Sequence, residues 1–142
     1  LHPSLRRQRQ MGIRVRVDVV QVSLDEKFAI EGMKSIVNKL LEVGIGTVIV
    51  TGGSIGCVVA NARQIVRVIA PDIDTIDGNG AGSCFSAGFI YASLRGWHLE
   101  QCARFATAQA SLKCSRAGYE VGSVEEGKRF ASTLTSEVET KI

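Results

Sequence analysis

The chain has 142 residues, which is enough for one folded domain with a core of its own. Hydrophobic residues make up 45% and charged residues 22% of it, a balance that excludes intrinsic disorder for the chain as a whole. The net charge of +3 is too small to require a nucleic-acid partner, and no apolar run approaches the roughly 18 residues that a membrane span needs.

Residues 1–17 form a basic N-terminal segment that holds five arginines and no acid. This composition is typical of a nucleic-acid-binding arm, or of the remnant of an organelle transit peptide. A solvated surface segment explains it equally, and we favour that interpretation. We therefore expect no nucleic-acid partner except through this segment, and no membrane partner.

Strands and helices alternate after the basic segment. β-Branched residues predict buried strands at 16–22, 47–51, 57–60 and 65–69. Apolar residues spaced by three and four predict helices at 25–43, 84–94 and 99–114, and a last surface helix from Ser123. Ser23 is a suitable N-cap for the first of these helices. The alternation predicts an α/β fold in which helices flank a mostly parallel sheet.

The four cysteines, Cys57, Cys84, Cys102 and Cys114, lack the spacings that are typical of a zinc site. Three of them fall among apolar residues of the predicted helices. Buried free thiols are typical of proteins in reducing compartments. We therefore expect an intracellular, reducing compartment, with the cytoplasm and an organelle both left open.

A glycine-rich stretch follows the fourth predicted strand and directly precedes a small-residue helix. It contains Gly78, Gly80 and Gly82 within five residues. The first turn of a helix has unpaired N–H donors and a positive dipole end, so a strand, a glycine turn and a helix start together aim the backbone at an anion. A turn that only lets the helix pack closely on the sheet explains the same glycines.

Residues 77–85 resemble the signature of the ribokinase-type (PfkB) sugar and nucleoside kinases, which reads Asp, two variable residues, Gly-Ala-Gly-Asp, a small residue and Phe. The resemblance implies that Gly80, Ala81 and Gly82 form an anion hole for the phosphoryl group. The final aspartate of that signature is the general base, and Ser83 stands in its place. A serine hydroxyl is not ionised near neutral pH, so the catalytic position is kept without its base.

Other segments resemble the same family in the same order along the chain. The resemblance implies nucleotide contacts for six residues: Ser23, Thr51, Gly53, Gly56, Thr107 and Gly118. It also places Glu26 near a magnesium ion and the phosphates, although a helix-capping carboxylate explains Glu26 as well. Residues 1–6 are similar to a segment from the middle of the kinase domain, so residues 1–142 correspond to its C-terminal part.

The resemblance implies a partial ribokinase-like domain that uses ATP and Mg²⁺. One hypothesis is a sugar kinase fragment that binds ATP but has impaired phosphotransfer, with a sugar as second partner if an N-terminal half exists. The alternative is a catalytically dead, fructokinase-like pseudokinase that serves as a structural or regulatory subunit, with protein partners or further copies of itself. Ser83 favours the alternative.

Overall fold

The computed structural model describes residues 17–25 and 27–141. Its elements, in chain order, are β1 (Val19–Ser23), α2 (Ile30–Glu42), β2 (Thr47–Thr51), the 3₁₀ turn η1 (Gly53–Ile55), β3 (Cys57–Ala60), β4 (Gln64–Val68), α3 (Ala81–Leu94), α4 (Leu99–Cys114), α5 (Val124–Ala131) and β5 (Ser136–Thr140). Most of the basic N-terminal segment, residues 1–16, lies outside the described residues, and so does Glu26.

The five described strands form one sheet in the order β1-β2-β3-β4-β5. β1 and β2 are parallel, because α2 carries the chain back between them, whereas the other three neighbouring pairs are antiparallel. The α/β class is therefore confirmed, but the expected mostly parallel pairing is corrected to a mixed sheet. For β2–β3 and β3–β4 the reason is that residues 52–56 and 61–63 are connections too short for a crossover, so they join antiparallel neighbours.

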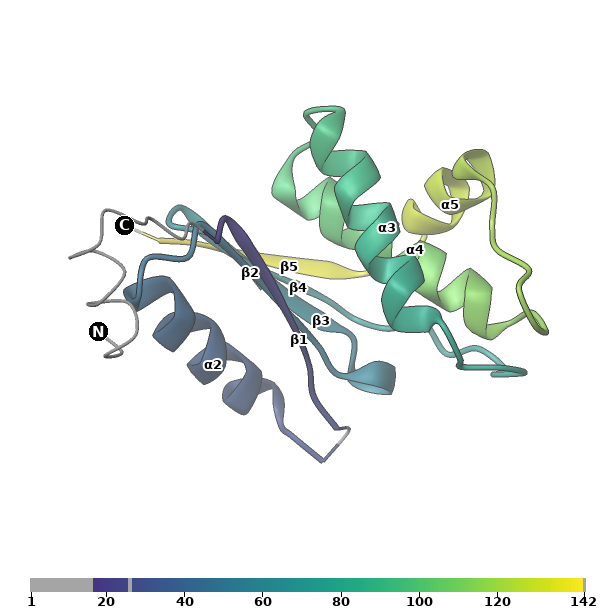
Figure 1. Cartoon of the computed structure of the whole chain (residues 1–142), viewed down its shortest axis with the longest axis horizontal. Coiled ribbons are helices and arrows are strands. Elements are labelled where there is room, and N and C mark those ends of the chain that lie inside the picture. The colour runs from purple at the N-terminus through teal and green to yellow at the C-terminus, as the bar shows by residue number, and fades with distance from the viewer. Residues whose placement is uncertain (1–16, 26, 142) are drawn as a thin grey trace, which may run out of the picture.

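Helices cover both faces of this sheet, as Figure 1 shows, with α2 alone on one face and α3, α4 and α5 on the other. Strand residues alternate between the two sides. Val48, Val50 and Val58 pack with Met33 and Val37 of α2 in one core cluster. The opposite cluster joins the other strand positions to α4 and α3, with members that include Ile49, Val59, Val66, Phe89 and Phe105. Because both faces are buried, β3 is apolar throughout and β2 is apolar between its terminal threonines, which made both strands predictable from sequence.

The first helix begins later than the sequence predicted. α2 starts at Ile30 with Ala29 at its N-cap, and the side chain of Ala29 cannot accept a hydrogen bond. Ser23 is the last residue of β1 instead, where its hydroxyl lies 3.0 Å from the Thr51 hydroxyl of β2. The pairing of β1 with β2 extends to these two residues and holds Ser23 in the sheet, so it does not start the helix.

The end of the chain adds a strand that the sequence analysis missed. α5 confirms the predicted surface helix, and Ser123 caps it by accepting a hydrogen bond from the Glu126 amide at 3.1 Å. β5 then pairs with β4 along the edge of the sheet. Only Val138 in β5 is apolar, and ion pairs such as Arg67–Glu137 at 3.5 Å accompany the backbone pairing. A strand with so little apolar content leaves almost no hydrophobic pattern to read.

The aromatic residues and the cysteines complete the description of the packing. Trp97 fills a gap between helices, with its ring 5.3 Å from that of Phe105 and 6.0 Å from that of Tyr91. The four cysteines are free, but only Cys57 and Cys102 are buried as expected, whereas Cys84 and Cys114 are half-buried. Within the described residues, no helix combines the length and the apolar composition that crossing a membrane requires.

Candidate functional site

A cavity of about 590 Å³ opens at one end of the sheet. β1, β2 and β4 end at this place and β3 begins there, since the register aligns Ser23 with Thr51, Thr51 with Cys57, and Cys57 with Val68. The segment after β4 and the first turn of α3 form the opposite wall. Strand ends of this kind are where open α/β sheets bind ligands.

The cavity brings together most of the residues that the sequence analysis singled out. Seven of them line it: Ser23, Thr51, Gly53, Gly56, Ala81, Gly82 and Thr107. Gly80 and Ser83 belong to the same helix start and are exposed, but they do not line the cavity. Gly118 does not line it either, and Glu26 lies outside the described residues.

The glycine turn confirms the predicted strand, turn and helix start. Gly80 is the N-cap of α3 and has a φ of +84°, in the left-handed region where glycine is favoured. The Cys84 amide donates to the Gly80 carbonyl at 2.9 Å, which closes the first turn. No side chain caps this helix start. The positive end of α3 therefore faces the cavity wall at Ala81 and Gly82 without a carboxylate of its own.

Asp77 ties the glycine turn to the end of α4. Its carboxylate accepts hydrogen bonds from the Asn79 amide at 3.0 Å and from the Gly118 amide at 3.2 Å. These bonds, led by the one from Asn79, and the nearby Lys113 ammonium hold the pKa of Asp77 below its usual value. The Asp77 amide also donates to the Cys114 carbonyl at 3.1 Å. Gly118 thus contacts the turn through Asp77, which the sequence analysis did not anticipate.

Lys113 is a second feature that the sequence analysis missed. It is only 3% exposed, and its ammonium lies 3.3 Å from the Asp77 carbonyl and 3.8 Å from the Asp77 carboxylate. The signal was present in the sequence: the spacing 102, 106, 110 and 113 places Lys113 on the apolar stripe of its helix. A buried lysine needs partners for its charge, and the half-buried Asp77 offers its carbonyl and, farther away, its carboxylate.

The loop before β3 is closed by backbone contacts. The Gly52 amide donates to the Gly56 carbonyl at 2.9 Å, and Gly56 has a φ of +97°. A Cβ at Gly56 would lie 2.0 Å from the Val68 carbonyl oxygen, so no other residue fits there without moving the backbone. Next to it, burial raises the pKa of the Cys57 thiol to about 11, despite its contact with Thr107.

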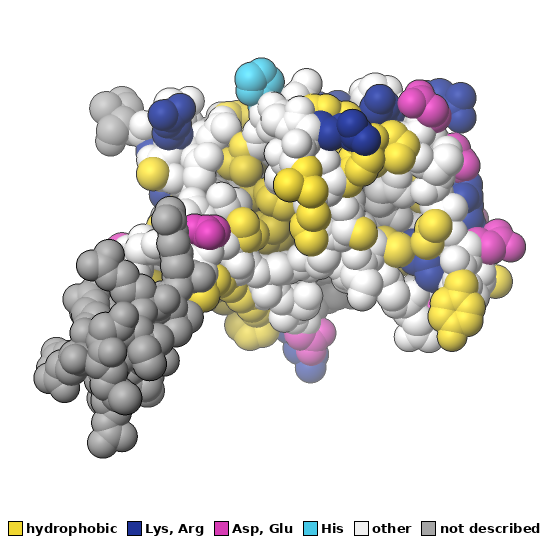
Figure 2. Space-filling view, turned by 45° about the horizontal axis from the view of Figure 1, so that its top comes forward, with side chains coloured by type: hydrophobic (Ala, Val, Ile, Leu, Met, Phe, Trp, Pro, Cys, Tyr) yellow, Lys and Arg dark blue, Asp and Glu magenta, His cyan; other side chains and the backbone are white. Residues whose placement is uncertain are grey.

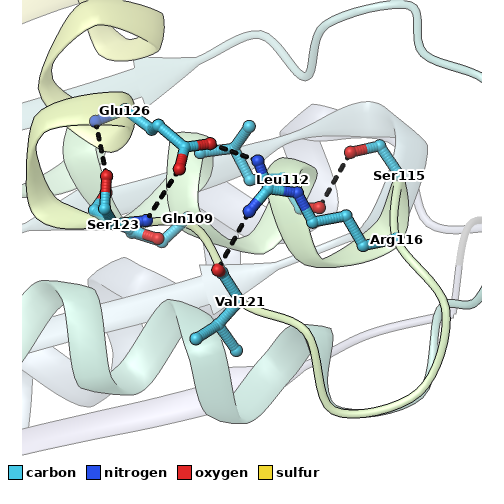
Figure 3. A network of polar contacts seen from close by, with 7 residues as sticks. All are labelled: Gln109, Leu112, Ser115, Arg116, Val121, Ser123 and Glu126. Atoms are coloured by element: carbon cyan, nitrogen blue, oxygen red, sulfur yellow. Dashed lines mark hydrogen bonds and ion pairs between the residues drawn. The ribbon is translucent and has the colours of Figure 1, made fainter.

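Polar contacts hold the connection between α4 and α5, which carries Gly118, in a defined shape (Figure 3). Arg116 forms an ion pair with Glu126 and donates to the Val121 carbonyl at 2.9 Å. The bond from Arg116 is the largest cause that lowers the pKa of Glu126. Gln109, inside α4, donates to the Ser123 carbonyl at 3.1 Å. The connection is therefore anchored at both of its ends.

Hydroxyl groups of α4 face inward but are already engaged. Thr107 donates to the Ala103 carbonyl at 2.8 Å, and Ser111 donates to the Thr107 carbonyl at 2.8 Å. Within the described part of the chain, no three His, Cys, Asp or Glu side chains gather into a metal-ligating cluster. Asp72 is the only acidic residue among the described residues that line the cavity.

Comparisons with known proteins identify the family and the fold of the chain. The model of the pfkB family carbohydrate kinases matches residues 19–126. A nucleoside kinase from Methanothermobacter thermautotrophicus is 33% identical over 99 residues, which cover 68% of this chain and 32% of that protein. A ribokinase structure from Thermotoga maritima shares the fold with a TM-score of 0.67 and 21% identity, covering 82% of this chain and 42% of that one.

An Escherichia coli protein of the ribokinase type, solved in complex with ATP and Mg²⁺, has a TM-score of 0.70 at 24% identity and covers 81% of this chain and 39% of its own. The chain spans about a third of the length of the curated relatives that it matches first. Because the family model spans most of the chain, the chain belongs to the pfkB family of carbohydrate kinases.

Proposed function

We propose that this chain is the C-terminal, nucleotide-binding part of a PfkB-type sugar kinase domain and binds ATP at the cavity described above. The observation that carries the proposal is the convergence of two glycine segments on one cavity, with Gly53 and Gly56 on one wall and Ala81 and Gly82 on the other. The uncapped start of α3 offers amides and a positive dipole end to phosphate oxygens. The cavity volume of about 590 Å³ falls within the range of small-molecule sites, roughly 300–1,000 Å³.

Magnesium fits this proposal as an ion that the nucleotide brings with it. Mg²⁺ is commonly held by one or two carboxylates together with substrate phosphates. Asp72 supplies one carboxylate at the cavity wall, and Glu26 is the candidate that the family resemblance adds. The metal would neutralise phosphate charge. The Escherichia coli relative solved with ATP and Mg²⁺ supports this pairing of cofactors.

Phosphotransfer is the step that we expect to be impaired. Ser83 lies in the first turn of α3, exposed and beside the anion-binding amides, where the family signature has its general base. A positioned base contributes about 10²–10⁴-fold to the rate of such a step. The sugar hydroxyl would also need to be held in line with the phosphate, and orientation of this kind is worth roughly 7–11 kcal/mol. The cavity walls described here provide the phosphate side of that alignment.

A second candidate function is a pseudokinase that acts as a subunit of a larger assembly. Large apolar side chains are exposed on β1 and α3, among them Val19 at 50%, Ile90 at 57% and Leu94 at 83%. The space-filling view of Figure 2 shows hydrophobic side chains reaching the surface between charged ones. β1 is also an edge strand of the sheet. Such a surface suits contact with another protein or with another part of the same protein.

Calorimetric titration with ATP and ADP, with and without Mg²⁺, tests the nucleotide site. We expect saturable binding of both nucleotides that strengthens with Mg²⁺. Gly82→Val, which adds bulk at the helix start, is the matched variant that should weaken it. Absence of binding at millimolar nucleotide would contradict the proposed site.

Assays of phosphotransfer to fructose, ribose and nucleosides separate the two candidate functions. They use the longest form of the protein that its gene encodes, unmodified and as Ser83→Asp, with Ser83→Asn as a control of the same shape without charge. If only the base is missing, Ser83→Asp should raise turnover by about 10²–10⁴-fold, whereas Ser83→Asn should not. No gain would favour the pseudokinase, and robust turnover by the unmodified protein would show that Ser83 does not impair the reaction.

A further inference from the structure

A buried lysine lies directly behind the glycine turn. Lys113 is in the last turn of α4 and is 3% exposed. Its side chain reaches toward the start of α3, because its Cε would lie 3.8 Å from a Cβ placed on Gly80. Burying an ammonium is costly unless the surroundings offer it partners, so this position calls for an explanation in terms of charge.

The Lys113 ammonium makes fewer hydrogen bonds to its partners than it has N–H donors. An ammonium has three N–H donors. One bonds the Asp77 carbonyl at 3.3 Å, and the Asp77 carboxylate at 3.8 Å is beyond hydrogen-bonding distance. The Asn79 and Gly118 amides already hold that carboxylate. The positive charge of Lys113 is therefore only loosely compensated within the described residues.

Lys113 does not itself line the cavity, but it lies behind one of its walls. Among the described residues that line the cavity, none is Lys or Arg. Two neighbours of Lys113 in α4, Ser111 and Cys114, do line it, as do Gly78 and Ala81 on the turn. Positive potential at the phosphate side thus has two sources, the start of α3 and Lys113 behind it.

We propose that Lys113 is a positioning residue of the phosphate-binding turn: its buried ammonium holds Asp77 and adds positive charge behind the first turn of α3. This inference rests on the proposed nucleotide site and deepens it, since it assigns the recognition of polyphosphate to a residue outside the glycine motif. Lys113 acts through the turn and through its charge. Arginine keeps that charge, and methionine keeps only the length of the side chain.

Binding of ligands that differ in charge tests this role. ATP, tripolyphosphate and adenosine are titrated into the unmodified protein, Lys113→Met and Lys113→Arg, with Lys128→Met as a control because Lys128 is exposed on α5. We expect Lys113→Met to weaken the binding of ATP and of tripolyphosphate by about tenfold, because the variant loses one positive charge near the phosphates. Adenosine affinity should not change, Lys113→Arg should retain most polyphosphate affinity, and the control should match the unmodified protein.

Each other outcome contradicts a distinct claim. If Lys113→Met leaves the affinity for polyphosphate unchanged, or lowers the affinity for adenosine equally, Lys113 supports the fold but does not recognise phosphate. If the unmodified protein binds none of the three ligands, the proposed nucleotide site is wrong and this inference with it.

A measurement on the unmodified protein covers the case in which Lys113→Met does not fold. The ¹³Cε resonance of Lys113, identified by its loss in Lys113→Arg, should shift when tripolyphosphate binds, and the Lys128 resonance should not. Bound tripolyphosphate without a shift at Lys113 would overturn the proposal.

Discussion

The two glycine-containing walls of the cavity look alike in sequence but serve different purposes. In the loop before β3, glycine is a steric requirement, because a Cβ at Gly56 would lie 2.0 Å from the Val68 carbonyl oxygen. In the turn before α3, a Cβ at Gly78 or Gly82 would meet nothing within 4 Å. The first wall needs glycine to fold. In the second, Gly80 also has a left-handed φ of +84°, but Gly78 and Gly82 leave the backbone open. The difference separates residues that build the site from residues that keep it accessible.

Substituting Gly56 should have the largest effect of the changes considered. Gly56→Ala combines a left-handed φ of +97° with a clash against backbone, so we expect a loss of about 3 kcal/mol or more in the free energy of unfolding. Chemical denaturation measures it. Gly78→Ala is the matched control, because the φ of Gly78 is not in the left-handed region and its surroundings are open, and its effect should stay within about 0.5 kcal/mol. If both substitutions changed the free energy of unfolding equally, the two walls would not differ in their need for glycine.

Some elements of the fold were predictable from the sequence, and others were not. β2, β3 and α4 were predicted at their exact bounds, since continuous apolar runs and helical spacing reflect burial. β5 was missed and α2 was predicted to begin too early. Both depend on pairing with distant strands, β5 with β4 and Ser23 with Thr51, and local sequence does not carry that information.

The candidate site was predictable where it consists of backbone. The glycine motif identified the helix start at Gly80 and the loop at Gly56. The side chains that support them were not found, because Asp77 and Lys113 act on each other across 36 residues. Their relation becomes visible only when α4 and the turn are placed side by side.

Acidic solution should reduce the contribution that Asp77 makes to the free energy of unfolding. Its pKa is lowered in the fold from 3.8, chiefly by the Asn79 amide. The carboxylate therefore contributes stability that is complete above its unfolded pKa and is lost as the pH falls through the lower folded pKa. The difference in free energy of unfolding between the unmodified protein and Asp77→Asn should be constant above about pH 5 and shrink in more acidic solution.

Urea denaturation at a series of pH values measures this dependence. Asp74→Asn, in the same connection and exposed, is the control and should show a smaller change with pH. A difference between Asp77→Asn and the unmodified protein that stays constant down to pH 2 would show that the contacts of Asp77 do not stabilise the folded chain.

A smaller change in stability than at Gly56, and of the opposite sign, is expected at Gly82. Gly82 lies within the first turn of α3 in open surroundings, so Gly82→Ala should raise the free energy of unfolding by about 0.5–1 kcal/mol. The added methyl group narrows the approach to the helix-start amides, and ATP affinity should fall. Chemical denaturation measures the expected gain in stability, and calorimetry measures the expected loss of ATP affinity. A parallel loss of stability and affinity would mean that Gly82, like Gly56, is needed for folding.

Mapping the bound nucleotide onto the backbone tests the central claim most directly. In the ¹⁵N-labelled protein, titration with ATP and Mg²⁺ is followed at each amide by NMR. We expect the largest shifts at residues 80–83 and 53–56, which line the cavity or directly adjoin its lining, with little change along α2 on the opposite face of the sheet. Shifts confined to α2 or α5, or no shifts at saturating ATP, would contradict the assignment of this cavity as the nucleotide site.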